Sequence, residues 1–479
     1  MIGYRFRLYP TKEQEKILLR WIGCQRVIYN AKVAEERYFR TFRNHLVELT
    51  GMPIPVDQTY AQFVTETTAF LRDVPSVVLR NGAALWRQAY LRYQRGLAER
   101  PKFKRKSGEQ SVWLTSEVFS FQPVVDWQTG DVLRYQLIVG TKKFPVGELV
   151  YCAHRPHGIP ASIHIKVSHG RWYVSFSCDD GTCSPDEADI AASMRTLEQD
   201  ALLERTLGLD RGVAKPLATS DGRVFDLLPV QKARIQKCRK QKVRWQRRAA
   251  RRQDGSRNQQ TAYARASRYD AYETNVRWDY AHQTSHRLVA DDRYELYVFE
   301  DLLIQNMTKR PKPKQDAKGR FVPNRASQKA ALNRAILASA WGQVLTFTRY
   351  KAQRTGKLVV VIPPAYSSQA CAVCGYTHPD NRQTQAEFVC LRCGHRANAD
   401  HNAAINIARR GVAKIVSGEF ERELEEAKAK VKRVRLRKLG SERSEVTPVE
   451  SPLVGPVGTQ ASHGSEKQEV PLETAETSA

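Results

Sequence analysis

Apolar residues recur at helical spacing in two stretches of the first hundred positions. The first stretch follows Thr11, and Gln14 stands three residues later, which is the spacing of a capping box at a helix start. The second stretch, "VPSVVLRNGAALWRQAYLRYQRGL", predicts an amphipathic helix whose aromatic residues belong to a core and whose arginines lie off the apolar stripe. The apolar stripes are Ile17, Trp21, Cys24, Ile28 and Ala31 in the first helix and Leu79, Ala83, Trp86, Tyr90, Tyr93 and Leu97 in the second.

Alternating apolar and polar residues predict strands on both sides of this helical region. The opening residues "GYRFRLYP" alternate enough to form a strand. After a basic loop at residues 99–108 come the β-like segments "SVWLTSEVFSFQ", "VLRYQLIVG" and "ASIHIKVSHGRWYVSFSCD". In the last segment "SHG" separates two alternating runs, which is typical of a hairpin. Polar residues near 180–203 then mark a boundary before a second unit.

The second unit contains short apolar runs that predict buried strands. One run ends in Asp210, with a further strand after "VAKP", the next run ends in Glu300, and the last is "KLVVVIPPAY". "RPKPKQDAKGRFVPNRAS" predicts a loop, "LNRAILASAWGQVLTFTRYKAQRTG" a single helix, and "NADHNAAINIARRG" a helix that ends at Gly411. Beyond it we expect a charged helix at 413–440 and a disordered tail at 441–479, which is rich in Pro, Ser and Glu and cannot form a core.

The charge balance makes a polyanion the expected partner. The 479 residues contain 77 Lys and Arg against 50 Asp and Glu, a net charge of +27, and the pI is about 9.8. The tail has seven Glu against two basic residues, so its net charge is −5 and that of the first 440 residues is +32. Nucleic acid fits this excess best. A membrane surface fits less well because no basic amphipathic anchor or lipidation motif occurs, and a solubilising excess is usually smaller.

Three basic segments are candidate nucleic-acid contacts. Residues 232–257 carry twelve Lys and Arg against one Asp around Trp245, which favours a phosphate-tracking surface over a solvated helix. The other two are the arginines of the second helix and the loop at 99–108. The candidate residues are Arg80, Arg87, Lys102, Lys104, Arg105, Lys106, Lys240, Arg247 and Arg248.

The sequence shows neither a signal peptide nor an apolar run long enough to span a membrane, so we expect a soluble intracellular protein. Its nine cysteines, an odd number, then favour a metal site over a set of disulfides. Two Cys-x-x-Cys pairs are separated by fifteen residues and can direct four thiolates to one ion. Four thiolates leave no open position, so the pattern predicts structural zinc. An iron–sulfur cluster or a redox pair is the alternative, but Gly375 and Gly394 behind the pairs favour zinc knuckles. The expected ligands are Cys371, Cys374, Cys390 and Cys393.

Three acidic residues stand at the ends of separate predicted elements. Asp210 and Glu300 each close a strand, and Asp400 begins the helix behind the second cysteine pair. Carboxylates that converge can hold magnesium, and two such ions about 4 Å apart activate water and stabilise the leaving oxygen in phosphodiester cleavage. Asp210 could instead pair with Arg211. Glu300 has an acidic neighbour, Asp301, and Asp400 could merely complement the positive end of its helix.

Beyond these patterns, the order "GLDRG", then "FEDL", then "NRQTQAEFVCLRCGHRANADHNAAINI" around the paired cysteines resembles the TnpB family. Members of this family are transposon-encoded RNA-guided nucleases and ancestors of the type V CRISPR effectors. The segments "YRFRLYPTKEQE", "GCQRVIYN", "RWYVSF" and "HQTSHRLV" also look like recurring segments of the family. The resemblance extends over the chain up to about residue 440.

The resemblance implies an α/β multi-domain protein with an RNase H-like RuvC nuclease domain, split along the chain. Asp210, Glu300 and Asp400 would be its catalytic residues and ligands of Mg²⁺ or Mn²⁺, and the four cysteines would form a zinc ribbon. The N-terminal half would be a wedge-like β-barrel domain interrupted by a helical recognition insert. The ranges are 1–10 and 109–180 for the wedge, 11–108 for the insert, 203–364 for the nuclease core with its basic helical region, 365–397 for the ribbon and 398–412 for the third acid.

The function implied is RNA-guided, metal-dependent cleavage of target DNA next to a short flanking motif, through a single RuvC-like site. Guide RNA and target DNA would be the partners of a monomer or dimer in the cytoplasm of a prokaryote. Some relatives have lost acidic residues and only bind DNA, whereas this chain keeps all three. Two alternatives are a non-cleaving RNA-guided DNA-binding repressor and a transposase or other transposition-associated DNA-binding protein.

Overall fold

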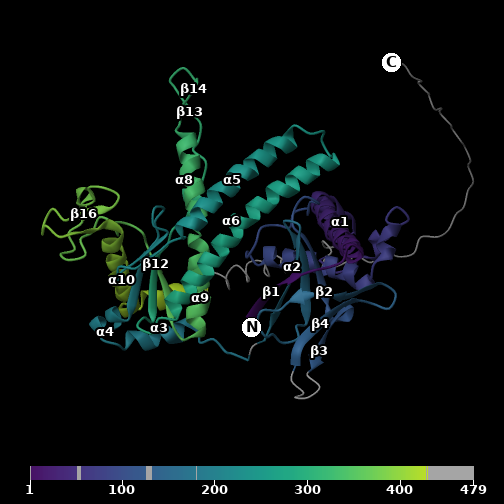
Figure 1. Cartoon of the computed structure of the whole chain (residues 1–479), viewed down its shortest axis with the longest axis horizontal. Coiled ribbons are helices and arrows are strands. Elements are labelled where there is room, and N and C mark those ends of the chain that lie inside the picture. Colours follow the sequence, from purple (N-terminus) through teal and green to yellow (C-terminus); the bar gives the residue numbers. More distant parts are fainter. Residues whose placement is uncertain (1, 51–55, 126–131, 180, 428, 430–479) are drawn as a thin grey trace, which may run out of the picture.

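Two lobes lie side by side in the computed structural model (Figure 1). The N-terminal lobe ends near residue 179, and the C-terminal lobe follows it. None of the described helices is both long enough and apolar enough to cross a lipid bilayer. The predicted tail and the end of the predicted charged helix lie outside the described residues. The structure describes residues 2–50, 56–125, 132–179, 181–427 and 429.

The strands of the N-terminal lobe are β1 (Ile2–Leu8), β2 (Gln110–Thr115), β3 (Phe119–Val125), β4 (Val132–Gly140), β5 (Pro145–Leu149), β6 (Tyr151–Cys152), β7 (Ser162–Ser168) and β8 (Arg171–Cys178). They form one sheet in the order β2-β7-β8-β1-β6 and a second in the order β3-β4-β5. β1 pairs along its whole length with β8, and β7 and β8 form the predicted hairpin. The described pairings give two sheets with a shared core and not one closed ring, so the expected β-barrel is not confirmed.

Between β1 and β2 lie the helices α1 (Lys12–Thr50) and α2 (Ser76–Gln94) and short 3-10 turns at Ala61–Phe63 and Ala69–Asp73, and a further turn, Ser116–Val118, follows β2. The predicted capping box starts α1: the backbone N–H of Thr11 donates to Oε1 of Gln14 at 2.9 Å, and that of Gln14 donates to Oγ1 of Thr11 at 3.3 Å. The apolar stripe of α2 is buried from Leu79 to Tyr90. Leu97 lies beyond the end of this helix and is 53% exposed, so its assignment to the stripe is wrong.

The C-terminal lobe contains the strands β9 (Thr206–Asp210), β10 (Leu217–Thr219), β11 (Val224–Phe225), β12 (Leu296–Glu300) and β15 (Leu358–Ile362). They form one sheet in the order β11-β10-β9-β12-β15. β9, β12 and β15 are parallel, so their carboxyl ends meet at one edge of the sheet. These are the runs that the sequence predicts as buried strands, and every residue of β12 is buried.

Helices cover both faces of this sheet (Figure 1). One face packs against α3 (Glu187–Arg195), α4 (Gln199–Glu204) and α10 (Ala399–Val416), and the other packs against α6 (Arg257–Val289) and α9 (Trp341–Arg354). Side chains alternate between the two faces along a strand. Gly208 and Asp210 of β9 therefore face α10, as do Val298 and Glu300 of β12.

Two glycines let α10 lie unusually close to the sheet. A Cβ atom on Gly208 would lie 1.9 Å from the backbone O of Ala404, and one on Gly411 would lie 2.2 Å from Cγ2 of Val298. Gly411 is thus inside the helix, where it serves close packing, and the predicted helix end at this residue is wrong. The close packing holds the first turn of α10, with Asp400, near the ends of β9 and β12.

The single helix predicted for residues 332–356 is in fact two helices. α8 (Ala326–Ala338) is separated from α9 at Ala340, whose φ of 56° lies in the left-handed region. The indole N–H of Trp341 donates to the backbone O of Gly212 at 3.1 Å and anchors the start of α9 beside the end of β9. This tertiary contact accompanies the break, and the residue at the break is an alanine, with Gly342 two residues further on.

Three further structures extend from the C-terminal lobe (Figure 1). α5 (Pro229–Ala250) packs along α6, and the residues predicted as a Pro/Lys-rich loop form a hairpin that projects with α8. The zinc-ribbon segment forms a two-stranded sheet next to α10. The strands of the projecting hairpin are β13 (Lys314–Gln315) and β14 (Phe321–Val322), and the short helix α7 (Ile304–Met307) precedes them. The ribbon consists of a 3-10 turn (Pro379–Asn381), β16 (Glu387–Val389) and β17 (Arg396–Asn398).

Candidate active site and metal centre

The three predicted acidic residues line one cavity of about 370 Å³ at the carboxyl ends of β9 and β12. Asp210 is the last residue of β9, Glu300 is the last residue of β12, and Asp400 is the second residue of α10. Parallel pairing aligns the two strand ends, side-chain alternation turns both carboxylates to the same face, and close packing of α10 brings in the third. The acidic neighbour Asp301 lines a different cavity.

Burial and mutual repulsion act on the carboxyl groups of this cavity. Burial, together with the charges of Glu300 and Asp400, raises the pKa of Asp210 to about 7. Burial also raises the pKa of Glu300, and a hydrogen bond from Ser367 and the charge of Arg211 oppose this rise. A divalent cation among these carboxylates would replace repulsion by attraction and would favour their ionised forms.

The raised pKa of Asp210 predicts how the metal-free protein responds to pH. The unfolded chain ionises this group near pH 4, whereas the folded protein keeps it protonated up to about pH 7. Between these values the folded state binds more protons than the unfolded state. The free energy of unfolding therefore falls as the pH rises from about 4 to about 7, and this loss is fully present above about pH 7.

We expect Asp210→Asn to raise the unfolding temperature of the metal-free protein by a few degrees at about pH 8 and to leave it unchanged near pH 4. Asparagine cannot ionise, so the variant does not lose the stability that the original protein loses when Asp210 ionises in its buried position. Thermal denaturation in EDTA at both pH values measures the difference. A variant that is no more stable than the original protein at the higher pH would contradict the account of this carboxyl group.

Two arginines that were not among the candidate site residues belong to the cavity. Arg211 is 5% exposed, and its Nη2 donates to the backbone O of Glu300, not to Asp210 as the sequence suggested. Nη2 of Arg382, from the ribbon, lies 3.8 Å from Oδ1 of Asp400. The only signal for Arg382 was its place in the family-like segment "NRQTQ". The cavity thus combines three acids with two fixed positive charges.

Side chains of the first half of α10 tie this helix to the chain that leads into the ribbon. Oδ1 of Asn402 accepts from the backbone N–H of Ala372 at 2.9 Å, and its Nδ2 donates to the backbone O of Ala370 at 2.7 Å. Nδ2 of Asn406 donates to the backbone O of Ser367 at 3.0 Å. The hydroxyl of Ser367 in turn donates to Oε1 of Glu300. The ribbon, α10 and one carboxylate are therefore linked by buried hydrogen bonds.

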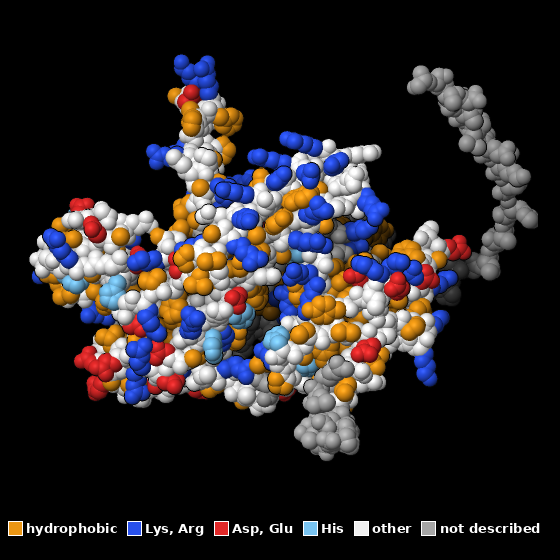
Figure 2. All heavy atoms as spheres, viewed as in Figure 1, with side chains coloured by type: hydrophobic (Ala, Val, Ile, Leu, Met, Phe, Trp, Pro, Cys, Tyr) orange, Lys and Arg blue, Asp and Glu red, His pale blue; other side chains and the backbone are white. Residues whose placement is uncertain are grey.

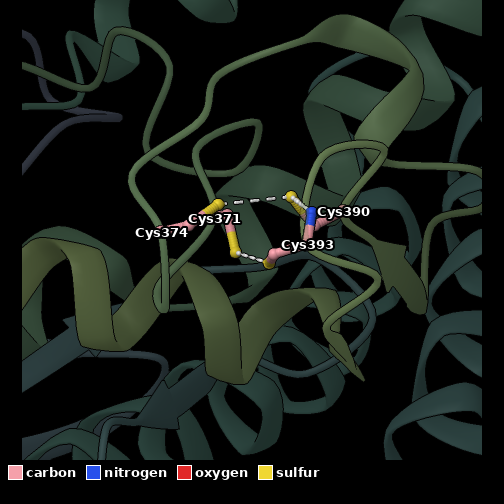
Figure 3. A group of neighbouring side chains, drawn as sticks. All are labelled: Cys371, Cys374, Cys390 and Cys393. Carbon is pink, nitrogen blue, oxygen red and sulfur yellow. Dashed lines mark hydrogen bonds between the residues drawn. The ribbon is translucent and has the colours of Figure 1, made fainter.

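The four cysteines of the two Cys-x-x-Cys pairs point toward one another (Figure 3). Among the described residues they are the one group of possible metal ligands whose atoms all lie within 4.8 Å. Sγ of Cys371 lies 3.7 Å from that of Cys393, and Sγ of Cys374 lies 3.5 Å from that of Cys390. Sulfurs bound at 2.3 Å around one tetrahedral zinc ion stand about 3.8 Å apart. Donor type, number and spacing therefore fit a single structural Zn²⁺.

Four of the six candidate contacts in the N-terminal lobe already have partners within the protein. Arg80 pairs with Glu117, and Nε of Arg87 donates to the backbone O of Val56 at 3.2 Å. The exposed Lys102 pairs with Glu99 at 2.6 Å. Nζ of Lys104 lies 4.0 Å from the ring centre of Tyr29, and Arg105 and Lys106 are exposed. These contacts leave the binding role of the loop at 99–108 a prediction.

The candidate residues in the C-terminal lobe lie on the outer face of α5. Lys240, Arg247 and Arg248 line an open groove of about 850 Å³ together with further arginines of the same helix. The guanidinium of Arg248 lies 5.0 Å from the ring centre of Trp245. Figure 2 shows Lys and Arg side chains gathered over α5 and α6.

Three family models match parts of the chain. A model described as a probable transposase matches residues 189–311, and one described as a Cas12f1-like TNB domain matches residues 341–407. A model described as a helix-turn-helix domain matches residues 1–38. In this structure those residues form β1 and the first part of α1.

Two relatives match most of the chain. "Putative RNA-guided DNA endonuclease InsQ" of Escherichia coli (strain K12) is 31% identical over 429 residues, which cover 87% of this chain and 94% of the relative. The chain belongs to the TnpB family. The resemblance stated from its motifs is thus confirmed. A second relative of this TnpB-family chain, "Putative RNA-guided DNA endonuclease" of Streptomyces pristinaespiralis, is 28% identical over 87% of this chain and 91% of its own length.

Part of this TnpB-family chain is also similar to CRISPR-associated proteins. The endodeoxyribonuclease Cas12f1 of Sulfoacidibacillus thermotolerans is 48% identical over 68 residues, which cover 14% of this chain and 16% of the relative. Among solved structures, the Cas12f1–sgRNA–target DNA complex aligns with 83% of this chain and 83% of its own chain, at 12% identity and a TM-score of 0.46.

Proposed function

We propose that the chain is an RNA-guided, metal-dependent endonuclease that cleaves target DNA next to a short flanking motif. The observation that carries this proposal is the cavity at which two parallel strands and α10 bring three carboxylates together, on a chain of net charge +27. A basic protein with one small acidic cavity can hold a nucleic-acid backbone and still concentrate metal ions at one point. The names of the relatives, which describe RNA-guided DNA endonucleases, support the same function.

The nuclease site would be of the RuvC type, with an RNase H-like core. Asp210, Glu300 and Asp400 would hold Mg²⁺ or Mn²⁺, which when bound activates water and stabilises the leaving oxygen. Ser367 orients the carboxylate of Glu300 through its hydrogen bond. Arg382, beside Asp400, is placed to pair with a phosphate oxygen of the DNA strand and to offset part of the charge of the acids.

The zinc ribbon would support this site without taking part in the chemistry. Four thiolates complete the coordination of Zn²⁺, so no position is open for water or substrate. The ribbon carries Arg382, and the chain leading into it is bound by Asn402 and Asn406 of α10. Zinc binding would therefore order both Arg382 and the helix of Asp400.

We propose that the outward face of α5 holds the phosphate backbone of the guide RNA or of its duplex with DNA. The N-terminal lobe would hold the remaining part of the guide and of the duplex. Arg239 pairs with Glu273 at 2.7 Å, and Lys242 pairs with Asp270 at 2.5 Å, so these two cations fasten α5 to α6. The remaining cations of the groove form no ion pair within the described part of the chain. They are Lys240, Arg244, Arg247, Arg248, Arg251 and Arg252.

Replacing Arg247 and Arg251 together by Gln is expected to weaken RNA binding about tenfold and to lower the slope of log K against log salt by about two. Each guanidinium would lose one phosphate contact. Fluorescence anisotropy over a salt series measures both quantities. Arg239→Gln is the matched control, because its guanidinium already pairs with Glu273. A loss of equal size in this control would argue against a specific backbone-binding face.

Cleavage of a plasmid tests the proposed function directly. We expect the purified protein, with the RNA that copurifies, to cut a plasmid that carries a sequence matching that RNA when magnesium is present, and not a plasmid without the match. Target binding without cutting would favour the RNA-guided repressor. Cutting or strand joining that persists after RNase treatment would favour a transposase.

A further inference from the structure

Four aromatic rings form a continuous row across α6 and α9 in the C-terminal lobe. Trp278 and His282 lie one turn apart on α6, and Phe347 and Tyr350 lie one turn apart on α9. The ring of His282 stacks on that of Phe347, with centroids 4.0 Å apart and planes at 17°. Trp278 contacts Phe347 at 5.2 Å, and Phe347 contacts Tyr350 at 6.0 Å. We call these four side chains the aromatic shelf.

The aromatic shelf is buried at its centre and open at its two ends. Phe347 is 9% exposed, whereas Trp278 and Tyr350 are each 43% exposed. Neither the indole N–H of Trp278 nor the hydroxyl of Tyr350 has a hydrogen-bond partner among the residues that the structure describes. Aromatic residues that serve only as core bury these surfaces, so the open rings provide flat apolar faces next to two unused polar groups.

The shelf lies where the two lobes meet. The segment that joins the lobes runs along α9: Glu187 pairs with Arg349 at 2.9 Å, and Gln353 donates to the backbone O of Pro185 at 3.0 Å. Figure 2 shows a hollow between the lobes, with histidine, Lys and Arg side chains around it. A ligand on the shelf would therefore lie between the lobes.

Arg155 of the N-terminal lobe carries a positive charge that acts on two side chains of the shelf, His282 and Tyr350. Its Nη2 donates to the backbone O of Gly3 at 2.8 Å, and its guanidinium lies 4.4 Å from the ring centre of Tyr4. Burial and the charge of Lys351 lower the pKa of His282, the charge of Asp279 opposes this, and the charge of Arg155 lowers the pKa further. Burial raises the pKa of Tyr350, and the charge of Arg155 opposes this rise. The shelf is thus an aromatic surface bordered by two cations, Lys351 and Arg155, and by one acid, Asp279.

We propose that the aromatic shelf binds an unpaired base of single-stranded RNA by stacking, with an adjacent phosphate paired to Arg155. This inference rests on the proposed RNA-guided function and names a binding site for the guide. Aromatic faces next to arginine and lysine are the combination with which proteins hold unstacked bases and their phosphates. The bordering positive charge favours a polyanion over a second copy of this strongly basic chain.

The position of the shelf favours the guide over the DNA strand that is cut. α9 begins at Trp341 beside the acidic cavity, and Tyr350 comes nine residues later, about 14 Å further along the helix. The scissile strand must enter the cavity, whereas the guide must remain outside it. The unused groups of Trp278 and Tyr350 can bond base edges or the ribose 2′-hydroxyl, which DNA lacks.

Binding of a fluorescein-labelled single-stranded RNA to the full chain, freed of copurifying nucleic acid, tests the proposal. We expect the Trp278→Leu, Tyr350→Leu double variant to bind it about tenfold more weakly, because leucine keeps apolar packing and loses the stacking face. Trp278→Phe should bind nearly as the original chain does. Tyr263→Leu is the matched control, since Tyr263 is 49% exposed on the same helix and outside the shelf.

Photo-crosslinking of the unmodified chain to the same RNA carrying 5-iodouridine locates the contact even if a variant fails to fold. The crosslink is expected at Trp278 or Tyr350. The proposal would be overturned by unchanged RNA affinity of the double variant or by crosslinks confined to other segments. It would also be overturned if the double variant lost more affinity for DNA of the same sequence than for the RNA, or if the substitutions dissociated a dimer of the chain. The readout involves no cleavage, so a chain that binds RNA here but never cuts DNA would fail only the proposed function.

Discussion

Glu300→Gln is expected to abolish RNA-guided DNA cleavage, with a loss of at least about a hundredfold, while Asp301→Asn cuts DNA at nearly the original rate. Glu300 points into the cavity that it shares with Asp210 and Asp400, whereas Asp301 lines a separate cavity. Replacing groups that merely support metal ligands commonly costs ten- to a hundredfold in metal affinity or activity, so removing a ligand should cost more. The two substitutions are adjacent in sequence and change the charge equally.

Plasmid cleavage over a series of magnesium concentrations measures this difference, and electrophoretic mobility shift of the target measures binding. Both variants should bind guide and target as the original chain does, because neither residue lies on a basic surface. Cleavage at the original rate by both variants would show that Glu300 does not belong to the catalytic site. Equal loss in both would indicate that charge near the strand end matters and not the position of one carboxylate.

Cys390→Ser is expected to remove zinc from the chain, lower its unfolding temperature by several degrees and abolish most DNA cleavage. Three thiolates hold zinc far less well than four, and structural zinc contributes directly to the stability of the segment that it closes. The loss should reach the acidic cavity, because the ribbon carries Arg382 and the two hydrogen bonds that Asn402 forms, one as acceptor and one as donor, tie α10 to the chain leading into the ribbon.

Elemental analysis should find about one zinc per chain in the original protein and in Cys183→Ser, and none in Cys390→Ser. Cys183 is an exposed cysteine outside the cluster and therefore serves as the matched control. A Cys390→Ser chain that retained zinc would disprove the four-cysteine site. One that lost zinc but cut DNA normally would show that the ribbon does not position α10.

The strands that carry the acids could be predicted because each is a short apolar run that ends in a charged residue. The run from Leu296 to Phe299 contains no charged residue, and Glu300 is the first charged position of β12. Asp210 stands at the same point of β9. The cysteine pairs could be predicted for a similar reason, since two-residue spacing within a pair and a glycine after it are local requirements of a metal knuckle.

The helix boundaries at Gly411 and Ala340 could not be predicted from local signals. A glycine commonly ends a helix, but Gly411 is needed where α10 lies against Val298 of a strand more than a hundred residues earlier. An alanine commonly continues a helix, but Ala340 adopts a left-handed conformation where Trp341 reaches Gly212. In both cases a contact across the fold overrides the local preference.

The amino-acid sequence by itself determined which residues could do chemistry: a basic surface, four thiolates and three carboxylates at the ends of elements. Only the tertiary structure decided which of them share a cavity, that Arg211 and Arg382 join the acids, and that Trp278 and Tyr350 form the ends of one aromatic row. The reason is that hydrophobic periodicity and ligand spacing act within a few residues along the chain. Strand order, the close approach of α10 and the meeting of the two lobes depend on residues far apart in sequence.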